Sequence, residues 1–268
     1  MSVLFDVADG VATVTLHRPE VRNAFGAGMG SALDDAYHKC DADDSIRAVV
    51  LTGTPPAFCS GADMSTGGDT FGTPNPTMFS AAAVSVPAWQ VRKPVIAAVN
   101  GHAIGLGFTL ALQCDIRIFA ADAKYGVVQV RRGVMGDAYS HWTLPRIVGL
   151  ANAADILLTG RTFDGYEARQ LGVCSRVLPN DEVLPAALEL ARDIAANTAP
   201  LSVAYSKALL WESAQLDAAA IEARETEYHH YLMGAPDARE GVLAFLEQRA
   251  PRWQGRVSTD WRADPSTR

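Results

Sequence analysis

Hydrophobic and polar residues alternate near the start of the chain, on both sides of Asp9-Gly10. This period of two is typical of half-buried strands, and Asp-Gly is a common two-residue turn, so residues 3–19 are predicted to form a β-hairpin. Short runs rich in β-branched residues, typical of strands buried on both faces, follow at 46–53, 94–101, 114–120 and 173–179. Helical patterns separate these runs, the first over 24–43. The order of strand, turn and helix predicts an α/β fold with a mostly parallel sheet.

The strand patterns stop after about residue 197. One long amphipathic helix is predicted over 202–233, and a further helix over 236–251, which begins at Pro236-Asp237 and ends at Pro251. We expect a mobile loop over the Gly-, Pro-, Ser- and Thr-rich residues 65–80 and a poorly ordered tail over 258–268. The predicted organisation is therefore a core over 1–197 and a helical region over 198–268, whose apolar residues indicate self-association.

Composition and charge argue against several classes of function. The net charge of -7 leaves no excess of basic residues for phosphates, which argues against nucleic-acid binding. Four widely spaced cysteines (40, 59, 114 and 174) form no CxxC pair or zinc-ligand spacing, so we expect no metal, reduced thiols and a cytoplasmic protein. The start of the chain does not resemble a signal peptide. Residues 94–114 carry no charge, but Pro94, Asn100, His102 and three glycines favour a strand, a turn and a buried helix over a membrane span.

Two segments, 49–64 and 95–108, each lead from a buried strand through a turn of small residues towards a helix. Ligands bind outside the carboxyl ends of parallel strands, and two backbone N–H groups that converge there form an oxyanion hole. The glycines do not fit rival phosphate-binding motifs, because "GLGFTL" lacks the third glycine of GxGxxG and no GK[ST] occurs. The alternative is structural: the glycines let helix and strand pack closely.

The residues of five ordered motifs resemble the enoyl-CoA hydratase/isomerase, or crotonase, superfamily. The motifs are "RPEVRNAF", "AFCSGADM", "VNGHAIGLGFTLALQCDIRI", "LTGRTFDGYEARQLGVCSRVLP" and "EGVLAFLEQRAPRW", and together they cover residues 3–253. The resemblance implies a crotonase-like spiral of ββα units, a helical C-terminal trimerisation region, and homotrimers or hexamers. It also implies an acyl-CoA thioester as substrate, with coenzyme A as part of that substrate and no other cofactor, and no membrane partner.

By position in these motifs, the resemblance implies that the N–H groups of Ala62 and Leu106 donate to an enolate oxygen. It implies a further set of substrate-binding residues: Arg22, Ala24, Ser60, Gly61, Asp63 and Gly107. In the hydratases two glutamates perform the acid–base chemistry. The corresponding residues here are Thr109 and Gln129, which do not exchange protons near neutral pH as carboxylates do. Thr109 is expected to hydrogen-bond its own helix, and Gln129 to order substrate or water.

Asp137 follows Gln129 by eight residues. Its position resembles that of a catalytic aspartate in the dienoyl-CoA isomerases and of a nucleophilic aspartate in the chlorobenzoyl-CoA dehalogenases. The dehalogenases' active-site tryptophan corresponds to Gln129 here, and their histidine has no match. Asp137 is thus predicted to be an acid/base or a nucleophile, and the alternative is a helix N-cap. His141 is one turn further along, where a surface role is the expectation.

The sequence therefore predicts an enzyme that stabilises an enolate of an acyl-CoA thioester, with isomerase, lyase and hydrolase-like reactions all open. The alternative is an acyl-CoA-binding protein that has lost catalysis. Trp89, Tyr139 and Trp142 are candidates for an acyl pocket or for plain core packing. His229 and His230 are adjacent, so they face different sides of a helix and make a poor metal pair.

Overall fold

The strands of the protein form two sheets in the computed structural model, which describes residues 1–26, 28–72 and 80–263. The larger sheet has the order β1-β2-β3-β5-β7-β9, and the smaller has the order β4-β6-β8. The larger sheet consists of Val3–Ala8, Val11–Leu16, Ala48–Gly53, Val95–Val99, Ile116–Ala120 and Arg176–Leu178 in that order. The smaller consists of Ala57–Cys59, His102–Ile104 and Tyr125–Gly126. Apart from the antiparallel β1–β2 hairpin, the pairs are parallel.

Consecutive strands alternate between the two sheets. β3, β5 and β7 belong to the larger sheet, and each is followed by a short strand of the smaller one, β4, β6 or β8. A helix follows after β6 and another after β8. The predicted spiral of ββα units is therefore confirmed, and the short strands bring the two glycine-bearing turns to one edge of the smaller sheet.

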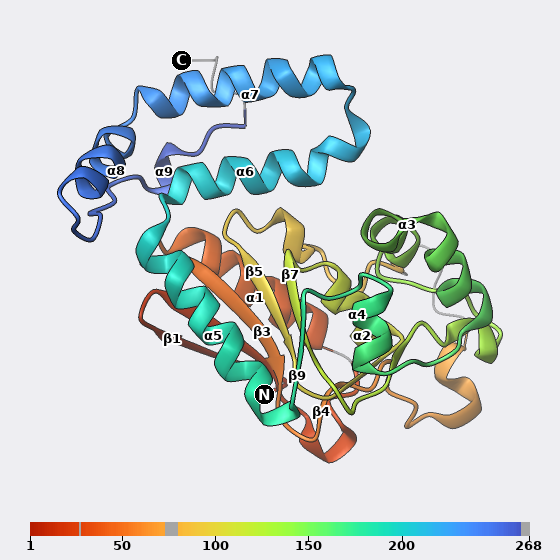
Figure 1. Cartoon of the computed structure of the whole chain (residues 1–268). Helices are drawn as coiled ribbons and strands as arrows, with labels where there is room; N and C mark the ends of the chain where they lie inside the picture. The colour runs from red at the N-terminus through yellow and green to blue at the C-terminus, as the bar shows by residue number, and fades with distance from the viewer. Residues whose placement is uncertain (27, 73–79, 264–268) are drawn as a thin grey trace.

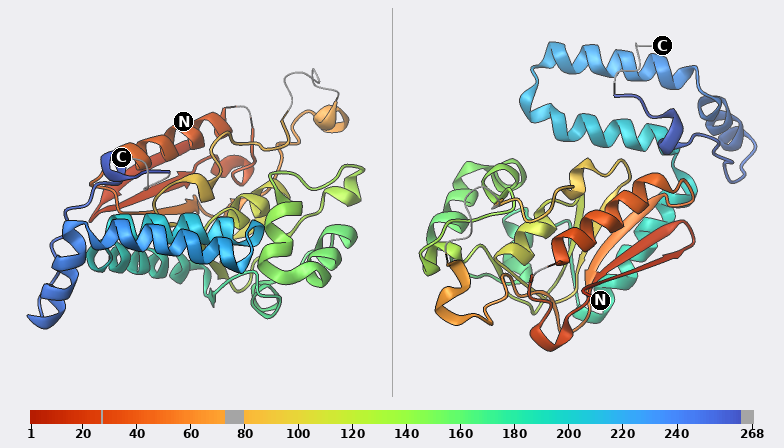
Figure 2. Two further views of the ribbon diagram at one scale, coloured as in Figure 1. Left: turned by 90° about the horizontal axis from the view of Figure 1, so that it is seen from above. Right: turned by 180° about the vertical axis from the view of Figure 1, so that it is seen from behind.

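Helices cover both faces of the larger sheet, with α1 on the side opposite α5 (Figures 1 and 2). The helices of the core are α1 (Met29–Ala42), α2 (Leu106–Leu112), α3 (Ser140–Thr159), α4 (Gly165–Gln170) and α5 (Asn180–Asn197). Apolar residues of the sheet and of α1, α2 and α5 form one large buried cluster. The predicted helix over 24–43 begins late, at Met29, because Gly28 adopts a left-handed conformation with φ 84°.

The predicted strands and hairpin are confirmed. In the hairpin, Asp9 and Gly10 both have positive φ (53° and 75°), as a tight turn between twisted strands requires. The short strands β4 and β6 were not predicted, because three residues are too few to show a period. The uncharged stretch 94–114 contains β5, β6 and α2, and within the described part of the chain no helix is long and apolar enough to cross a membrane.

The four cysteines are free and buried. Burial raises the pKa of Cys40, Cys59 and Cys114 to about 12, and that of Cys174 to about 11. Their thiols are therefore protonated at neutral pH and pack as small apolar groups.

The helical region differs from the prediction in two places. The single helix expected over 202–233 is wrong: α6 (Pro200–Glu212) and α7 (Ala218–Met233) run side by side (Figure 1) and are separated by a 3-10 turn at Ser213–Gln215. The second helix has its own N-cap, since Asp217 Oδ1 accepts a hydrogen bond of 2.8 Å from the Ala220 N–H. The predicted C-terminal helix is present as α8 (Pro236–Leu246).

The start of the tail is also ordered, contrary to expectation. α9 (Val257–Asp260) is followed by Trp261, whose ring stacks on Tyr205 at a centroid distance of 4.4 Å. Residues 264–268 lie outside the described residues. In the loop expected over 65–80, Gly67–Phe71 form a 3-10 helix, and residues 73–79 lie outside the described part.

Asp115 joins the helical region to the sheet. One carboxylate oxygen accepts the Val95 N–H at 2.7 Å and lies 2.7 Å from Lys207 Nζ. The other accepts the Trp211 indole N–H at 2.7 Å. Lys207 Nζ also donates to the carbonyl oxygens of Ala88 and Lys93. One buried carboxylate thus holds together the start of β5, the start of β7 and helix α6.

We predict that Lys207→Met destabilises the protein more than a charge removal at the surface does. The side chains of Lys207 and Asp115 are only 6% and 11% exposed, so the variant leaves a buried carboxylate without its cation. The free energy of unfolding, measured by urea denaturation, is expected to fall by about 3–5 kcal/mol. Arg192→Met is the control, because the Arg192–Asp9 pair is 50% and 71% exposed and should contribute less than about 1 kcal/mol. Equal losses in the two variants would contradict the prediction.

Candidate active site

The two glycine-bearing turns meet at the carboxyl ends of β4 and β6, which pair in parallel. Gly61 has φ 94°, and a β-carbon built on it would lie 2.7 Å from the Ile104 carbonyl oxygen. A β-carbon on Gly107 would lie 2.2 Å from the Cys59 carbonyl oxygen. Any larger residue at either position would push the turns apart, so the glycines have the packing role that the structural alternative assigned to them. That close approach also brings Ala62 and Leu106 to the same edge.

Backbone geometry leaves the N–H groups of Ala62 and Leu106 outside the hydrogen bonds that hold their own turns. Phe25 and Ala62 form an isolated parallel bridge, in which Phe25 donates to the Gly61 carbonyl at 2.7 Å and the Asp63 N–H donates to Phe25 at 3.1 Å. In such a bridge the N–H of the central residue points away from the partner segment. Leu106 is the first residue of α2, where a backbone N–H has no acceptor within the helix.

The segment 18–25 packs against the turn after β4. Arg18 Nη2 lies 2.8 Å from Asp63 Oδ2, and the Ser60 N–H donates to the Arg22 carbonyl at 3.1 Å. A hydrogen bond from the Ser65 N–H and the Arg18 guanidinium hold the pKa of Asp63 below its usual range. Ala24 is buried, and Arg22 is exposed with a left-handed φ of 54°. The structure therefore brings Arg22, Ala24, Ser60, Gly61 and Asp63 together, although Asp63 is already paired within the chain.

Asn23 is a positioning residue that the sequence analysis missed. It is fully buried, and its side-chain N–H groups donate to the carbonyls of Thr54, Ala57 and Phe58 at 2.7–3.2 Å. Its Oδ1 accepts the Arg18 N–H at 2.8 Å. Asn23 thereby fastens the 18–25 segment to β4. Asparagine's tolerance of positive φ, here 54°, was the available signal in "RNAF".

Asp137, Gln129 and Thr109 form a second part of the site. Gln129 Nε2 donates to Asp137 Oδ1 at 3.0 Å, and the Thr109 side chain lies close enough to affect this carboxyl group. Burial raises the pKa of Asp137 above its ordinary value, and hydrogen bonds to the carboxylate, from backbone N–H and from Gln129, offset part of that rise. As expected, Thr109 is fully buried and its Oγ1 donates to its own helix, at the Leu106 carbonyl, over 3.0 Å.

Gln129 links this group to the turn at Leu106. Its amide lies against Gly105, 3.3–3.5 Å from the position of a β-carbon there. Gln129 is 6% exposed, and its Oε1 is buried without a hydrogen-bond partner among the described residues. A carboxylate only accepts hydrogen bonds, so Gln129 must turn its NH₂ group towards ionised Asp137 and leave Oε1 unpaired. Such an atom is costly unless a ligand or water supplies a donor.

The helix-cap interpretation of Asp137 is wrong. Helix α3 begins at Ser140, its N-cap is Tyr139, and no side chain caps it. Only the backbone carbonyl of Asp137 takes part in this turn, as the acceptor for the Ser140 N–H at 2.9 Å. His141 is exposed, with Nδ1 3.4 Å from Ser140 Oγ.

Trp89, Tyr139, Trp142 and Trp211 gather into one cluster, called the aromatic group below. His229 and His230 are exposed on α7, and within the described ranges no three His, Cys, Asp or Glu residues are grouped as metal ligands. A cavity of about 770 Å³ lies elsewhere, between α6, α7 and α8, and none of the predicted site residues lines it.

Comparisons with known proteins found similarity over nearly the whole chain. The family model "Enoyl-CoA hydratase/isomerase" matches residues 6–256. The enoyl-CoA hydratase ACTT3 of Alternaria alternata is 37% identical over 92% of this chain and 84% of its own length. The (E)-benzylidenesuccinyl-CoA hydratase of Thauera aromatica is 36% identical over 95% of this chain and 100% of its own. The crystal structure of a probable enoyl-CoA hydratase/isomerase from Mycobacterium abscessus has a TM-score of 0.91 and 51% identity, covering 95% and 99% of the two chains.

We predict that Gly61→Ala costs more stability than the same change at Gly172. Both glycines have positive φ (94° and 83°), which costs an L-residue about 1–2 kcal/mol. Only Gly61 also meets backbone at 2.7 Å; the nearest atom to Gly172 would be 4.0 Å away. The free energy of unfolding is expected to fall by about 3 kcal/mol or more in Gly61→Ala, since overpacking adds about 1–3 kcal/mol. Equal losses would show that the two turns do not depend on this close approach.

Proposed function

Because the chain belongs to the enoyl-CoA hydratase/isomerase family, we propose that it binds an acyl-CoA thioester where its two glycine-bearing turns meet. The N–H groups of Ala62 and Leu106 then donate to the thioester oxygen as it becomes an enolate. The observation that carries this proposal is the close packing of Gly61 on Ile104. It holds both donors in place before the ligand arrives, which is the condition for strong transition-state stabilisation.

The segments around this point are the proposed binding surface for the rest of the thioester. Arg22 is exposed beside Ser60, where a guanidinium can pair with a phosphate of coenzyme A. Ala24, Gly61, Asp63 and Gly107 shape the backbone around the pantetheine arm. Coenzyme A enters as part of the substrate, and the proposal requires no separate cofactor. The buried thiols support a reducing, cytoplasmic location.

Asp137 is the proposed proton shuttle. It is the carboxylate of the Asp137–Gln129–Thr109 group, and its raised pKa makes it a better base than an exposed aspartate. Gln129 holds its side chain by a hydrogen bond, and neither Gln129 nor Thr109 titrates near neutral pH. The unpaired Gln129 Oε1 offers an acceptor for a hydroxyl or water beside the thioester.

One carboxylate favours a double-bond shift over hydration. Shifting a double bond needs a single group that removes a proton and returns it to another carbon. Hydration needs a base for water and an acid for the α-carbon within one turnover, and each missing group typically costs about 10²–10⁴ in rate. The alternative, a protein that only binds acyl-CoA, predicts binding without turnover of any thioester.

The test pairs two assays on wild-type protein and on Asp137→Asn. We predict slow hydration of crotonyl-CoA, faster conversion of a 3-enoyl-CoA, and loss of at least about a hundredfold in the latter in Asp137→Asn with thioester affinity unchanged. Asp122→Asn, at an exposed position, is the matched control and should keep full activity. If Asp137 is the base, kcat/KM falls as the pH decreases through a pKa above the ordinary carboxyl range, because protonation removes the base.

Three outcomes would count against the proposal. If calorimetry showed no heat of binding with any acyl-CoA, the proposed binding site would be refuted. Rapid hydration that is unchanged in Asp137→Asn would show that Asp137 is not the shuttle. Full binding with no turnover of either thioester in the wild-type protein would favour the binding-only alternative.

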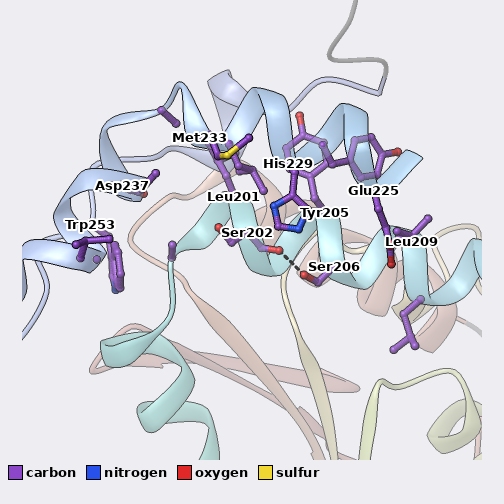
Figure 3. A pocket seen from close by; sticks show the side chains of 18 of the residues that line it. Leu201, Ser202, Tyr205, Ser206, Leu209, Glu225, His229, Met233, Asp237 and Trp253 are labelled. Carbon is purple, nitrogen blue, oxygen red and sulfur yellow. Dashed lines mark hydrogen bonds between the residues drawn. The ribbon is translucent and has the colours of Figure 1, made fainter. Parts of the chain in front are cut away.

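We also propose that the helical region assembles the chain into a trimer, or a hexamer of two trimers. α6, α7 and α8 line the apolar cavity of about 770 Å³, with Leu209, Met233 and Trp253 around it (Figure 3). Large apolar side chains nearby face solvent in the single chain: Leu210, Met233, Val242, Phe245 and Leu246 are 60–82% exposed. Apolar surface of this extent is typical of a protein–protein interface.

A charge in this groove should prevent assembly. We expect wild-type protein to show at least three times the chain mass of 28.6 kDa by light scattering at micromolar concentration. Met233→Glu should shift the mass towards a single chain, because the glutamate would be buried without a partner. Val7→Glu, at an exposed apolar position on β1, is the control and should leave the mass unchanged. A monomeric wild-type protein would refute the proposal.

A further inference from the structure

The aromatic group is built around Trp89. The ring centroid of Trp89 lies 4.8 Å from that of Tyr139, 4.9 Å from Trp142 and 5.5 Å from Trp211. Trp142 and Trp211 are stacked at 5.7 Å, and Tyr139 meets Trp89 edge-on at 83°. These are the offset and edge-to-face geometries that aromatic rings prefer. The rings come from the 3-10 turn Ala88–Gln90, the start of α3 and the end of α6.

The aromatic group is fixed to the same backbone as Asp137. Tyr139 follows Asp137 by two residues, so their Cα atoms are at most about 7 Å apart. Between them, the Ala138 N–H donates to the Ala81 carbonyl at 2.7 Å, and Gln113 Nε2 donates to the Ala138 carbonyl at 3.2 Å. These bonds join Asp137 to the segment that leads to Trp89. A group attached to a carbon that Asp137 serves is therefore within reach of these rings.

Two rings of the aromatic group already have polar partners within the chain. The Trp211 indole N–H is bonded to Asp115, and the Arg146 guanidinium lies 4.2 Å from the centroid of Trp142. On the side nearest Asp137, Tyr139 is 40% exposed and Trp89 is half-buried. Tyr139 also has a left-handed φ of 64°, which is strained for a bulky residue and concentrates at functional positions. A strained backbone thus holds the Tyr139 ring in a position that is accessible to a ligand.

From this juxtaposition we propose that the acyl group of the substrate carries an aromatic ring, which packs against Tyr139 and Trp89. The proposal rests on the proposed function, since it assumes a thioester bound beside Asp137. A flexible alkyl chain would gain only from burial, whereas a ring also gains from edge-to-face contact with rings that are already fixed in place. Tyr139 and Trp89 are then the residues that set acyl specificity.

The test uses three saturated thioesters that cannot be hydrated: 3-phenylpropanoyl-CoA, nonanoyl-CoA with the same number of acyl carbons, and butyryl-CoA. Isothermal calorimetry on the wild-type protein should show 3-phenylpropanoyl-CoA binding about fivefold more tightly than nonanoyl-CoA, the gain expected for an aromatic pair. In Tyr139→Leu and in Trp89→Leu this preference should disappear, while butyryl-CoA affinity stays within about threefold. Tyr166→Leu, at a tyrosine that is 62% exposed on α4, is the matched control and should keep the preference.

Each outcome has one meaning. Nonanoyl-CoA binding as tightly as the phenyl thioester in the wild-type protein would overturn the aromatic proposal while leaving the proposed function intact. The same holds if both leucine variants weaken all three thioesters equally, because the rings would then be structural. Absence of binding of all three thioesters to the wild-type protein would instead refute the proposed function. Retained butyryl-CoA binding in either leucine variant shows that the variant is folded.

Discussion

The carboxylate of Asp115 connects the parts of the molecule that the site needs. Through the Val95 N–H it fixes the start of β5, the strand that leads to β6 and the turn at Gly105. Through Lys207 and Trp211 it holds α6 on the core and sets the position of one wall of the aromatic group. A buried charge is tolerated only when its lone pairs are satisfied, and here three donors satisfy it. The site and the helical region are therefore not independent.

The close approach of the two turn backbones is the second constraint. It explains why few side chains with acid–base groups lie at the site. Two turns that touch through Gly61 and Gly107 leave no room for side chains between them, so the groups they present are N–H donors. Backbone donors need no rotamer to be fixed on binding. The polar residues around them, Asn23 and Arg18, are used to hold the loop that carries Ala62. In the proposed mechanism, proton transfer is left to Asp137, because the carboxylate of Asp63 is already paired with Arg18.

The elements that the sequence predicts correctly are those long enough for a pattern to repeat. The Asp9-Gly10 hairpin and the β-branched runs of β3, β5 and β7 have enough residues to show their period. The strands β4, β6 and β8 have two or three, and their existence depends on pairing with one another. The break between α6 and α7 was hidden because Ser213–Gln215 continue the helical composition, and Asp217 acts as a cap only once the chain has turned. The contact of Gln129 with Asp137 spans eight residues through a 3-10 turn and an irregular segment, which no periodicity describes.

In the proposed mechanism, Thr109 and Gln129 stand where the resemblance to the hydratases places two glutamates, and this changes how Asp137 titrates. Two further carboxylates at this depth would compete for one proton, and their pKa values would separate as a coupled set. With Thr109 and Gln129 in those places, Asp137 is a single titrating group, whose pKa is raised by burial and lowered in part by hydrogen bonds to the carboxylate. When it is ionised, Gln129 turns its NH₂ group towards it, and the buried Oε1 has no partner among the described residues. When it is protonated, it becomes a donor itself, and the Thr109 oxygen can accept while its own proton stays on the Leu106 carbonyl. In the proposed mechanism, the charge of Asp137 thus decides how Gln129 is oriented, and the other neighbour, Thr109, is bonded to Leu106, whose N–H is the proposed donor to the thioester oxygen.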